Sequence, residues 1–173
     1  MKEFSLDGKI AIVTGGGRGI GRAIALALAE AGANIIVAAR TTKEIEETAA
    51  KVEELGRACL AVRADVIKAS EVTQMVNAAI AKFGKIDILV NQAGGGGARK
   101  PLVPLPGYHP AWSKDLPDFL RPISEEMWHL VVDTNLTSMF LCAREVGPHM
   151  IKQEKGKIIN MSSFVGAKGF PNQ

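Results

Sequence analysis

The chain has 173 residues, of which 47% are hydrophobic and 23% charged, as in an ordinary soluble globular domain. Its net charge of +3 is too small and too evenly spread to indicate nucleic-acid binding. No apolar run approaches the roughly 20 residues of a membrane span, and residues 1–9 lack the apolar stretch of a signal peptide. We therefore expect neither nucleic acid nor a membrane as a partner. Cys59 and Cys142 lie in apolar surroundings, which predicts buried free thiols and a reducing cytoplasm.

Short apolar runs and helical patterns alternate strictly along most of the chain. The run 34–39 is apolar on both faces, as in a central parallel strand. Residues 70–83 carry apolar side chains at the i, i+3, i+4 and i+7 spacing of a helix that covers a sheet. Strands are predicted at 10–13, 34–39, 58–62, 87–90 and 156–161, and helices at 22–31, 41–55, 70–83 and 124–150.

Capping residues mark the expected ends of these helices. Thr41 and Glu44 have the spacing of a capping box, and Ser70 and Ser124 are expected to cap the third and fourth helices. Glycine follows the expected ends of the first three helices, at Gly32, Gly56 and Gly84.

This alternation predicts an α/β fold, a Rossmann-like doubly wound parallel sheet with helices on both faces. The expected strand order is 3-2-1-4-5, with a ligand crevice at the carboxyl ends of strands one and four. Residues 1–173 are expected to belong to a single domain.

A glycine-rich turn at 14–21, Thr-Gly-Gly-Gly-Arg-Gly-Ile-Gly, joins the first strand to the first helix. Glycine allows the backbone to turn through positive φ and to approach a pyrophosphate closely. The free N–H groups of the following helix then face the phosphates. A tight turn without a ligand is the alternative interpretation. The expected cofactor-binding residues in this turn are Thr14, Gly15, Gly17, Arg18, Gly19, Ile20 and Gly21.

The end of the second strand predicts NADP as the cofactor, with NAD less favoured. An NAD site usually has an Asp or Glu at this point to accept from the ribose 2′-OH, and here the position holds Ala39. Arg40 follows directly and can contact a 2′-phosphate, which Arg18 can approach from the other side. Solvated arginine side chains are the alternative for both positions.

Five motifs occur in a fixed order along the chain. They are Thr14–Gly21, Asp65-Val66, Asn91-Gln92-Ala93-Gly94, Thr134-Asn135-Leu136 and the strand segment that ends at Ser162-Ser163. In this order they resemble the short-chain dehydrogenase/reductase family, whose second motif contacts adenine. Gln92 departs from the asparagine that the family has at the second place of its Asn-Asn-Ala-Gly motif. The resemblance adds Asp65, Val66, Asn91, Ala93 and Gly94 to the expected cofactor-binding residues.

The resemblance also implies a catalytic pair, Ser163 and Asn135. In the family the serine donates a hydrogen bond to the substrate oxygen, and the asparagine holds a water of the proton relay. A satisfied core amide is the alternative for Asn135, and no metal is expected. The resemblance implies an NADP-dependent oxidoreductase that interconverts a small-molecule alcohol and a ketone by hydride transfer.

The family's acid–base tyrosine and its lysine do not fall within these residues. The tyrosine is expected at position 176, and the only tyrosine present, Tyr108, is followed four residues later by Trp112. We therefore expect residues 1–173 to be an incomplete NAD(P)-binding Rossmann domain, an N-terminal fragment that is truncated after strand five and inactive alone. A family domain usually runs to roughly 250 residues. The alternatives are a non-catalytic dinucleotide-binding module and a flavin or methyl-donor binding domain.

Two further expectations concern the second half of the chain. Residues 95–123, rich in Gly and Pro, form an insertion that is either a substrate-side lid or a packed surface excursion. The helix at 124–150 is apolar around most of its circumference, and Gly147-Pro148 predicts a bend near its end. We expect it to pack on the sheet and also on a partner subunit in a homo-oligomer.

Overall fold

A computed structural model of the chain describes residues 4–95 and 121–163. Five strands and the helices between them follow one another in the expected alternation. The elements are β1 (Ile10–Thr14), α1 (Gly19–Glu30), β2 (Asn34–Ala39), α2 (Thr42–Glu54), β3 (Cys59–Arg63), α3 (Ala69–Phe83), β4 (Ile88–Asn91), α4 (Glu125–Val132), the π-helix η4 (Asp133–Thr137), α5 (Ser138–Lys152) and β5 (Lys157–Asn160).

The strands form one parallel sheet in the order β3-β2-β1-β4-β5, which confirms the predicted fold. The register pairs Thr14 of β1 with Asn91 of β4, and Asn91 with Asn160 of β5. The chain changes direction of winding between β1 and β4, so the connections from these two strands leave on opposite faces. A crevice opens at the carboxyl ends of the strands at such a point.

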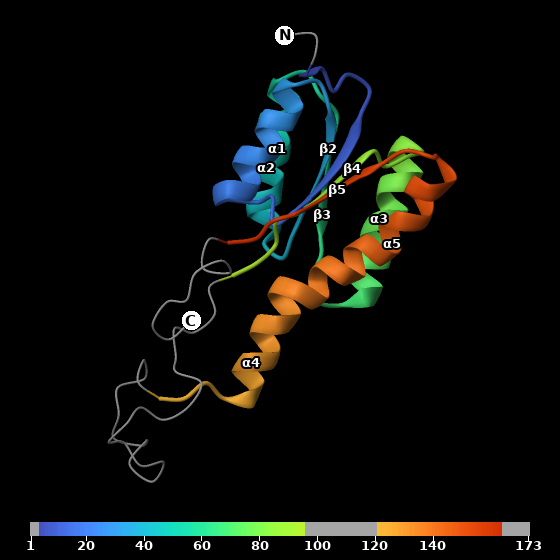
Figure 1. Cartoon of the computed structure of the whole chain (residues 1–173). Coiled ribbons are helices and arrows are strands. Elements are labelled where there is room, and N and C mark those ends of the chain that lie inside the picture. The colour runs from blue at the N-terminus through green and yellow to red at the C-terminus, as the bar shows by residue number, and fades with distance from the viewer. Residues whose placement is uncertain (1–3, 96–120, 164–173) are drawn as a thin grey trace.

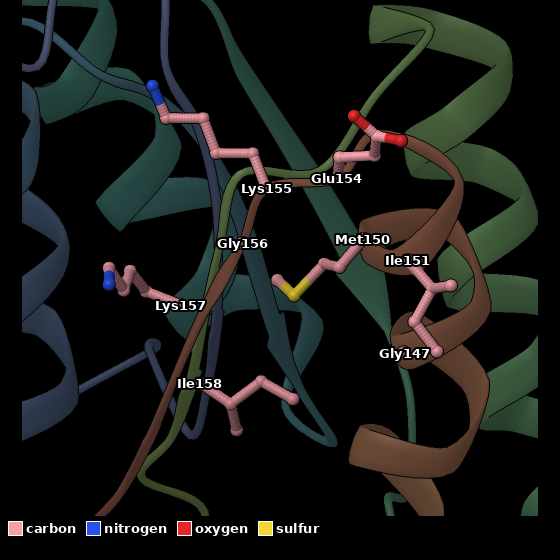
Figure 2. A pocket seen from close by; sticks show the side chains of 8 residues that line it. All are labelled: Gly147, Met150, Ile151, Glu154, Lys155, Gly156, Lys157 and Ile158. Atoms are coloured by element: carbon pink, nitrogen blue, oxygen red, sulfur yellow. The ribbon is translucent and has the colours of Figure 1, made fainter.

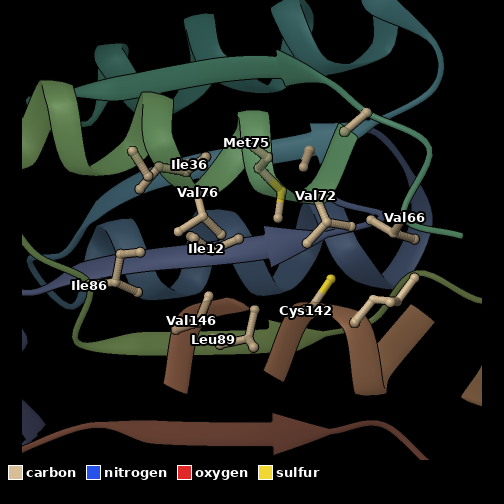
Figure 3. Packing of buried hydrophobic residues seen from close by; sticks show 14 of the residues in the cluster. Ile12, Ile36, Val66, Val72, Met75, Val76, Ile86, Leu89, Cys142 and Val146 are labelled. Carbon is tan, nitrogen blue, oxygen red and sulfur yellow. The ribbon is translucent and has the colours of Figure 1, made fainter. Parts of the chain in front are cut away.

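Helices cover both faces of the sheet, with α1 and α2 on one face and α3 and α5 on the other (Figure 1). Successive residues of a strand point to opposite faces, so β1 feeds two cores. Ile10 and Ile12 pack in the cluster with α3 and α5, and Ala11 and Val13 in the cluster with α1 and α2. Figure 3 shows the first cluster, in which Met75 and Val76 of α3 lie over Ile12 and Ile36. Both predicted thiols, Cys59 and Cys142, are buried and free.

Two predicted caps are wrong. Thr41 precedes α2, but its side chain makes no capping hydrogen bond, so the capping box does not form. The third helix begins at Ala69 after Lys68, so Ser70 lies inside its first turn and not at the N-cap. Ser124 does cap α4, because its side chain accepts the N–H of Met127 at 3.2 Å.

The single helix predicted at 124–150 is instead α4, η4 and α5 in succession. The structure has no break at Gly147 or Pro148, since α5 continues through both to Lys152. The irregular hydrogen bonding falls at η4, whose central residue is Asn135. In Figure 1 the helices α4 and η4 extend α5 away from the sheet. Several large apolar side chains on this stretch are more than 45% exposed: Trp128, Leu130, Leu136 and Phe140.

Strand β5 forms an open edge of the sheet within the described residues. All four of its residues are exposed, and Ile158 and Ile159 keep 40% and 46% of their surface accessible. The core therefore ends at β4 on this side. Of the helices in the described ranges, none has both the length and the apolar character that crossing a membrane requires.

Candidate functional site

A groove lies at the carboxyl ends of the strands, where the sequence predicts it. Its walls come from the turns after β1, β2, β3 and β4. The lining residues are Gly15, Gly17, Arg18, Gly19, Ile20, Gly21, Ala38, Ala39, Arg40, Thr41, Glu44, Ala64, Asp65, Val66, Ile67, Gln92, Ala93, Gly94 and Thr134. Eleven of the fifteen site residues expected from the sequence are in this set; Thr14, Asn91, Asn135 and Ser163 are not.

The glycine turn after β1 is packed too tightly for a side chain at Gly15 and at Gly21. Gly15 has φ +67°, and a Cβ there would lie 2.9 Å from Cα of Ala93. A Cβ on Gly21 would collide with the carbonyl oxygen of Gly15. The turn is held down because the N–H of Gly15 donates to the carbonyl of Ala38 at 2.7 Å. This geometry is a cradle in which the backbone at Gly15 and Gly21 lines the groove closely.

The first turn of α1 opens directly into the groove. Its N-cap residue, Arg18, makes no side-chain capping hydrogen bond, and Gly19, Ile20 and Gly21 line the groove. The N–H groups of the first turn of a helix have no partner within the helix and carry its positive dipole end. Such an arrangement suits an anion such as a pyrophosphate.

The end of β2 presents a cation and no carboxylate. Ala39 and the exposed Arg40 line the groove at this point. Arg18 is 82% exposed, and its Nε lies 3.9 Å from Oε1 of Glu44, so this pair is loose and solvent-screened. Glu44, which the sequence analysis did not place in the site, brings one negative charge to the same end of the groove.

Asp65 and Val66 form the groove wall after β3. Glu71 holds this turn in place, because its Oε2 accepts the N–H of Asp65 at 2.8 Å. That hydrogen bond and the ammonium of Lys68 lower the pKa of Glu71. The Asp65 turn is therefore a fixed wall whose support comes from the first turn of α3.

Thr14 and Asn91 lie behind the groove and fasten its wall. Thr14 is 1% exposed, and its Oγ1 accepts the N–H groups of Gln92 and Ala93, each at 3.1 Å. Asn91 is 2% exposed, and its Nδ2 donates to Oδ1 of Asn160 at 2.8 Å. Both residues join neighbouring strands at the edge where the groove opens.

The amide of Asn135 connects the helix η4 to the segment after β4. Its Oδ1 accepts the N–H of Gly95 at 3.2 Å, and its Nδ2 donates to the carbonyls of Val131 at 2.9 Å and Gly95 at 3.3 Å. Asn135 is half-buried, so this amide is satisfied by backbone groups beside the groove. π-Helical turns within α-helices are frequent at functional sites.

Ser163 follows β5, three residues beyond Asn160, and is exposed. Because β4 and β5 are parallel, this strand end and the Asn91–Gly94 segment lie at the same edge of the sheet. The insertion at 95–123, with Tyr108, lies outside the described residues except at its two ends.

Two acceptor atoms beside the groove are buried without a hydrogen-bond donor among the described residues, Oδ1 of Asn91 and Oε1 of Gln92. Buried acceptors without donors are rare in folded proteins and often mark places where water or a ligand binds. Gln92 lines the groove, although its amide oxygen is itself buried. The glycine cradle and the open helix end fit a dinucleotide.

A second hollow lies between the end of α5 and the start of β5 (Figure 2). Met150 projects from α5 toward Gly156, and the charged side chains of Lys155 and Lys157 extend away from it. This hollow is at the amino end of the strand, away from the edge at which α/β sheets bind ligands. It lacks the converging polar groups of the first groove.

The site residues expected from the sequence do not include the lining residues Glu44, Thr134 and Gln92. They also do not include the supporting residues Arg22, Thr48 and Glu71. The motifs indicate residues that are expected to face a ligand. They do not indicate the residues that hold those ligand-facing residues in place. Thr48 carried one signal, since it is a polar residue at an inward position of an otherwise amphipathic helix.

Fold and groove together define an α/β protein of the Rossmann-like dinucleotide-binding class. The family model of the short chain dehydrogenases matches residues 9–173. The chain belongs to this family.

Similar proteins agree with this assignment. The chain is 40% identical over 168 residues to a 3-oxoacyl-acyl-carrier-protein reductase, FabG, of Staphylococcus epidermidis, covering 95% of this chain and 60% of that protein. It resembles the structure of a 7α-hydroxysteroid dehydrogenase complexed with NADH and 7-oxo glycochenodeoxycholic acid, at a TM-score of 0.83 and 32% identity, covering 99% of this chain and 59% of the other. It also resembles a metagenomic short-chain oxidoreductase in complex with NADP, at a TM-score of 0.78 and 29% identity, covering 96% and 67%. The chain thus spans about 60% of the length of the curated relatives it matches.

Proposed function

We propose that this chain binds NADP and supplies the cofactor-binding half of an oxidoreductase that interconverts an alcohol and a ketone. The observation that carries the proposal is the groove itself. It combines the glycine cradle and open end of α1 with a cation, Arg40, at the end of β2. Relatives are described with NADH or with NADP, so a nicotinamide dinucleotide is the supported class and the 2′-phosphate is the finer proposal.

Each part of the groove has a role in this proposal. The turn at Gly15–Gly21 and the first turn of α1 would hold the pyrophosphate through backbone N–H groups. Asp65 and Val66 would flank the adenine, and Ala93 and Gly94 would line the side toward the nicotinamide. The nicotinamide supplies the hydride, and the chain's own residues bind, orient and exclude water.

NADP is favoured over NAD by the residues after β2. Ala39 cannot accept a hydrogen bond from a ribose 2′-OH, which an Asp or Glu accepts in NAD sites. Arg40 can form a bidentate, charge-assisted contact with a 2′-phosphate. Glu44 works against this preference, and its loose, solvent-screened pair with Arg18 offsets little of that effect.

Ser163 and Asn135 are the proposed catalytic residues. By family resemblance Ser163 would donate a hydrogen bond to the substrate oxygen, and the Asn135 segment would hold a water of the proton relay. General acid–base catalysis contributes about 10²–10⁴-fold to a rate. The family's tyrosine and lysine are not among the 173 residues, so we propose that this chain alone turns over very slowly.

A binding module without chemistry is the second candidate function. The groove favours it as well, because Asn135 and Ser163 are not among its lining residues. It predicts the same groove and the same NADP affinity, and it differs only in what the complete gene product does.

The proposal is tested by titrating the purified chain with NADP and with NAD, followed by an assay for alcohol oxidation. We expect saturable NADP binding and negligible turnover. No binding of either dinucleotide would overturn the proposal. Turnover on adding back a segment with Tyr-x-x-x-Lys would distinguish the enzyme from the binding module.

A further inference from the structure

A compact hydrogen-bond network joins the glycine turn to α2. The carbonyl oxygen of Gly17 accepts from Nε of Arg22 at 2.9 Å and lies 3.2 Å from Oγ1 of Thr48. The same Nε lies 3.0 Å from Oγ1 of Thr48, and Nη2 of Arg22 donates to the carbonyl of Glu44 at 3.3 Å. Thr48 is fully buried, with its hydroxyl also 3.0 Å from the Glu44 carbonyl.

These hydrogen bonds end on the backbone carbonyls of Gly17 and Glu44, in two segments that border the part of the groove expected to hold the adenosine. Gly17 belongs to the turn that faces the expected pyrophosphate and directly precedes Arg18. Glu44 belongs to the first turn of α2, three residues after Thr41 and four after Arg40. Arg18 and Arg40 are thus carried by different elements, and Arg22 and Thr48 bridge these elements by side chains.

We propose that Arg22 and Thr48 act as a clamp that fixes the distance between the glycine turn and the start of α2, and thereby sets the preference for a 2′-phosphate. We define the clamp as the hydrogen bonds of Nε of Arg22 and of the Thr48 hydroxyl to the carbonyl of Gly17, together with the bond of Nη2 of Arg22 to the carbonyl of Glu44. The selectivity part rests on the NADP binding proposed above. Arg22 and Thr48 are positioning residues, since they act through the backbone and through Arg18 and Arg40.

The physical reason lies in the geometry that a phosphate contact requires. A bidentate arginine contact depends on how the guanidinium is placed relative to the phosphate. Without the clamp, the glycine turn can shift relative to α2. NADP has to reach the turn with its pyrophosphate and Arg40 with its 2′-phosphate at once. NAD makes only the first contact, so it is less sensitive to the spacing.

The test uses a matched pair of substitutions at one buried position. Thr48→Val keeps the shape and removes the hydroxyl, whereas Thr48→Ser keeps the hydroxyl. Glu47→Gln is the control, because it removes only the exposed 3.2 Å ion pair of Glu47 with Arg22. Each protein is titrated with NADP and NAD, and amide hydrogen exchange of residues 15–21 is measured without cofactor.

For Thr48→Val we expect faster exchange of the turn amides and an NADP-to-NAD affinity ratio that falls by about fivefold, the effect of one lost hydrogen bond. Thr48→Ser and Glu47→Gln should retain the unaltered ratio and exchange. A purely structural role would lower the melting temperature and leave the affinity ratio unchanged, and that result would overturn the clamp.

The two proposals fail differently. If the unaltered protein binds neither dinucleotide, the proposed function and the selectivity role both fall, and the exchange measurement alone decides whether the clamp holds the turn. If the protein binds NADP and Thr48→Val changes neither the ratio nor the exchange, only the clamp fails.

Discussion

The Oγ1 atom of Thr14 accepts the backbone N–H of Ala93 at 3.1 Å and so fastens the end of β1 to the end of β4. The same oxygen accepts the N–H of Gln92, also at 3.1 Å. These are the two strands between which the groove opens. Thr14, at the edge of the glycine motif, therefore holds the wall of the groove that follows β4. This role does not require Thr14 to contact a ligand.

Replacing Thr14 by Val should destabilise the protein and weaken dinucleotide binding together. The substitution leaves the N–H of Ala93 without its acceptor and the N–H of Gln92 with only the carbonyl of Val90, at 3.1 Å. An unsatisfied N–H of this kind costs about 1–3 kcal/mol of unfolding free energy. Urea unfolding measures the loss, and NADP titration measures the binding. Thr14→Ser retains the oxygen and should behave like the unaltered protein. A Thr14→Val protein of full stability would contradict this role.

The strand order and the position of the groove were predictable from the sequence, and the supports of the groove were not. Apolar runs such as 34–39, which alternate with helical patterns along the chain, can be recognised from the local sequence. The right-handed crossover rule then predicts how these strands are arranged in one sheet. Thr48 lies 31 residues from the carbonyl of Gly17 that it contacts, so no local pattern connects it to the turn. Arg22 directly follows the turn, but no local pattern indicates that its side chain also bonds to α2. Ser70 shows the limit of capping rules, because Ser inside a first turn and Ser at an N-cap look alike in sequence.

The π-helix η4 could not be predicted from the sequence either. The spacing of apolar residues at 124–150 fits an α-helix throughout, and a π-turn adds one residue without disturbing that pattern much. The bonds from Asn135 to Gly95 and Val131 stabilise this segment, and they depend on where the chain returns after β4.

Asp87 should make the fold sensitive to acid. It is 8% exposed, and it accepts the N–H of Ile10 at 3.0 Å and pairs with Lys85 at 3.0 Å and Lys9 at 3.4 Å. Burial raises its pKa, but the hydrogen bonds from Lys85 and the backbone of Ile10 outweigh burial, and the net pKa lies below the usual 3.8.

A carboxyl whose pKa is lowered by folding stabilises the fold above its unfolded pKa and loses that effect as the pH falls through the folded value. The melting temperature should therefore drop as the pH falls below 3.8, and Asp87→Asn should remove this part of the drop. Thermal unfolding of both proteins between pH 2.5 and pH 7 is the measurement. Parallel curves for the two proteins would show that Asp87 does not contribute.

The exposed apolar side chains of α4, η4 and α5 should make the chain self-associate. Phe140 is 57% exposed and lies on the stretch that also exposes Trp128 and Leu136. Phe140→Glu places a charge in this surface and should shift sedimentation toward monomer. Glu54→Lys, at the end of α2 on the opposite face, is the control and should leave the association unchanged. An unaltered protein that is monomeric throughout would contradict the expectation.

The preference for a 2′-phosphate is the central claim, and Arg40 tests it most directly. A hydrogen bond to a charged group contributes about 1.5–3 kcal/mol, so Arg40→Ala should weaken NADP binding by roughly tenfold or more and leave NAD binding nearly unchanged. Lys51→Ala, at the far end of α2, controls for the loss of a positive charge alone. Titration of the three proteins with both dinucleotides decides the matter. The account predicts tighter NADP than NAD binding by the unaltered protein and a selective loss in Arg40→Ala, and tighter NAD binding by the unaltered protein would contradict it.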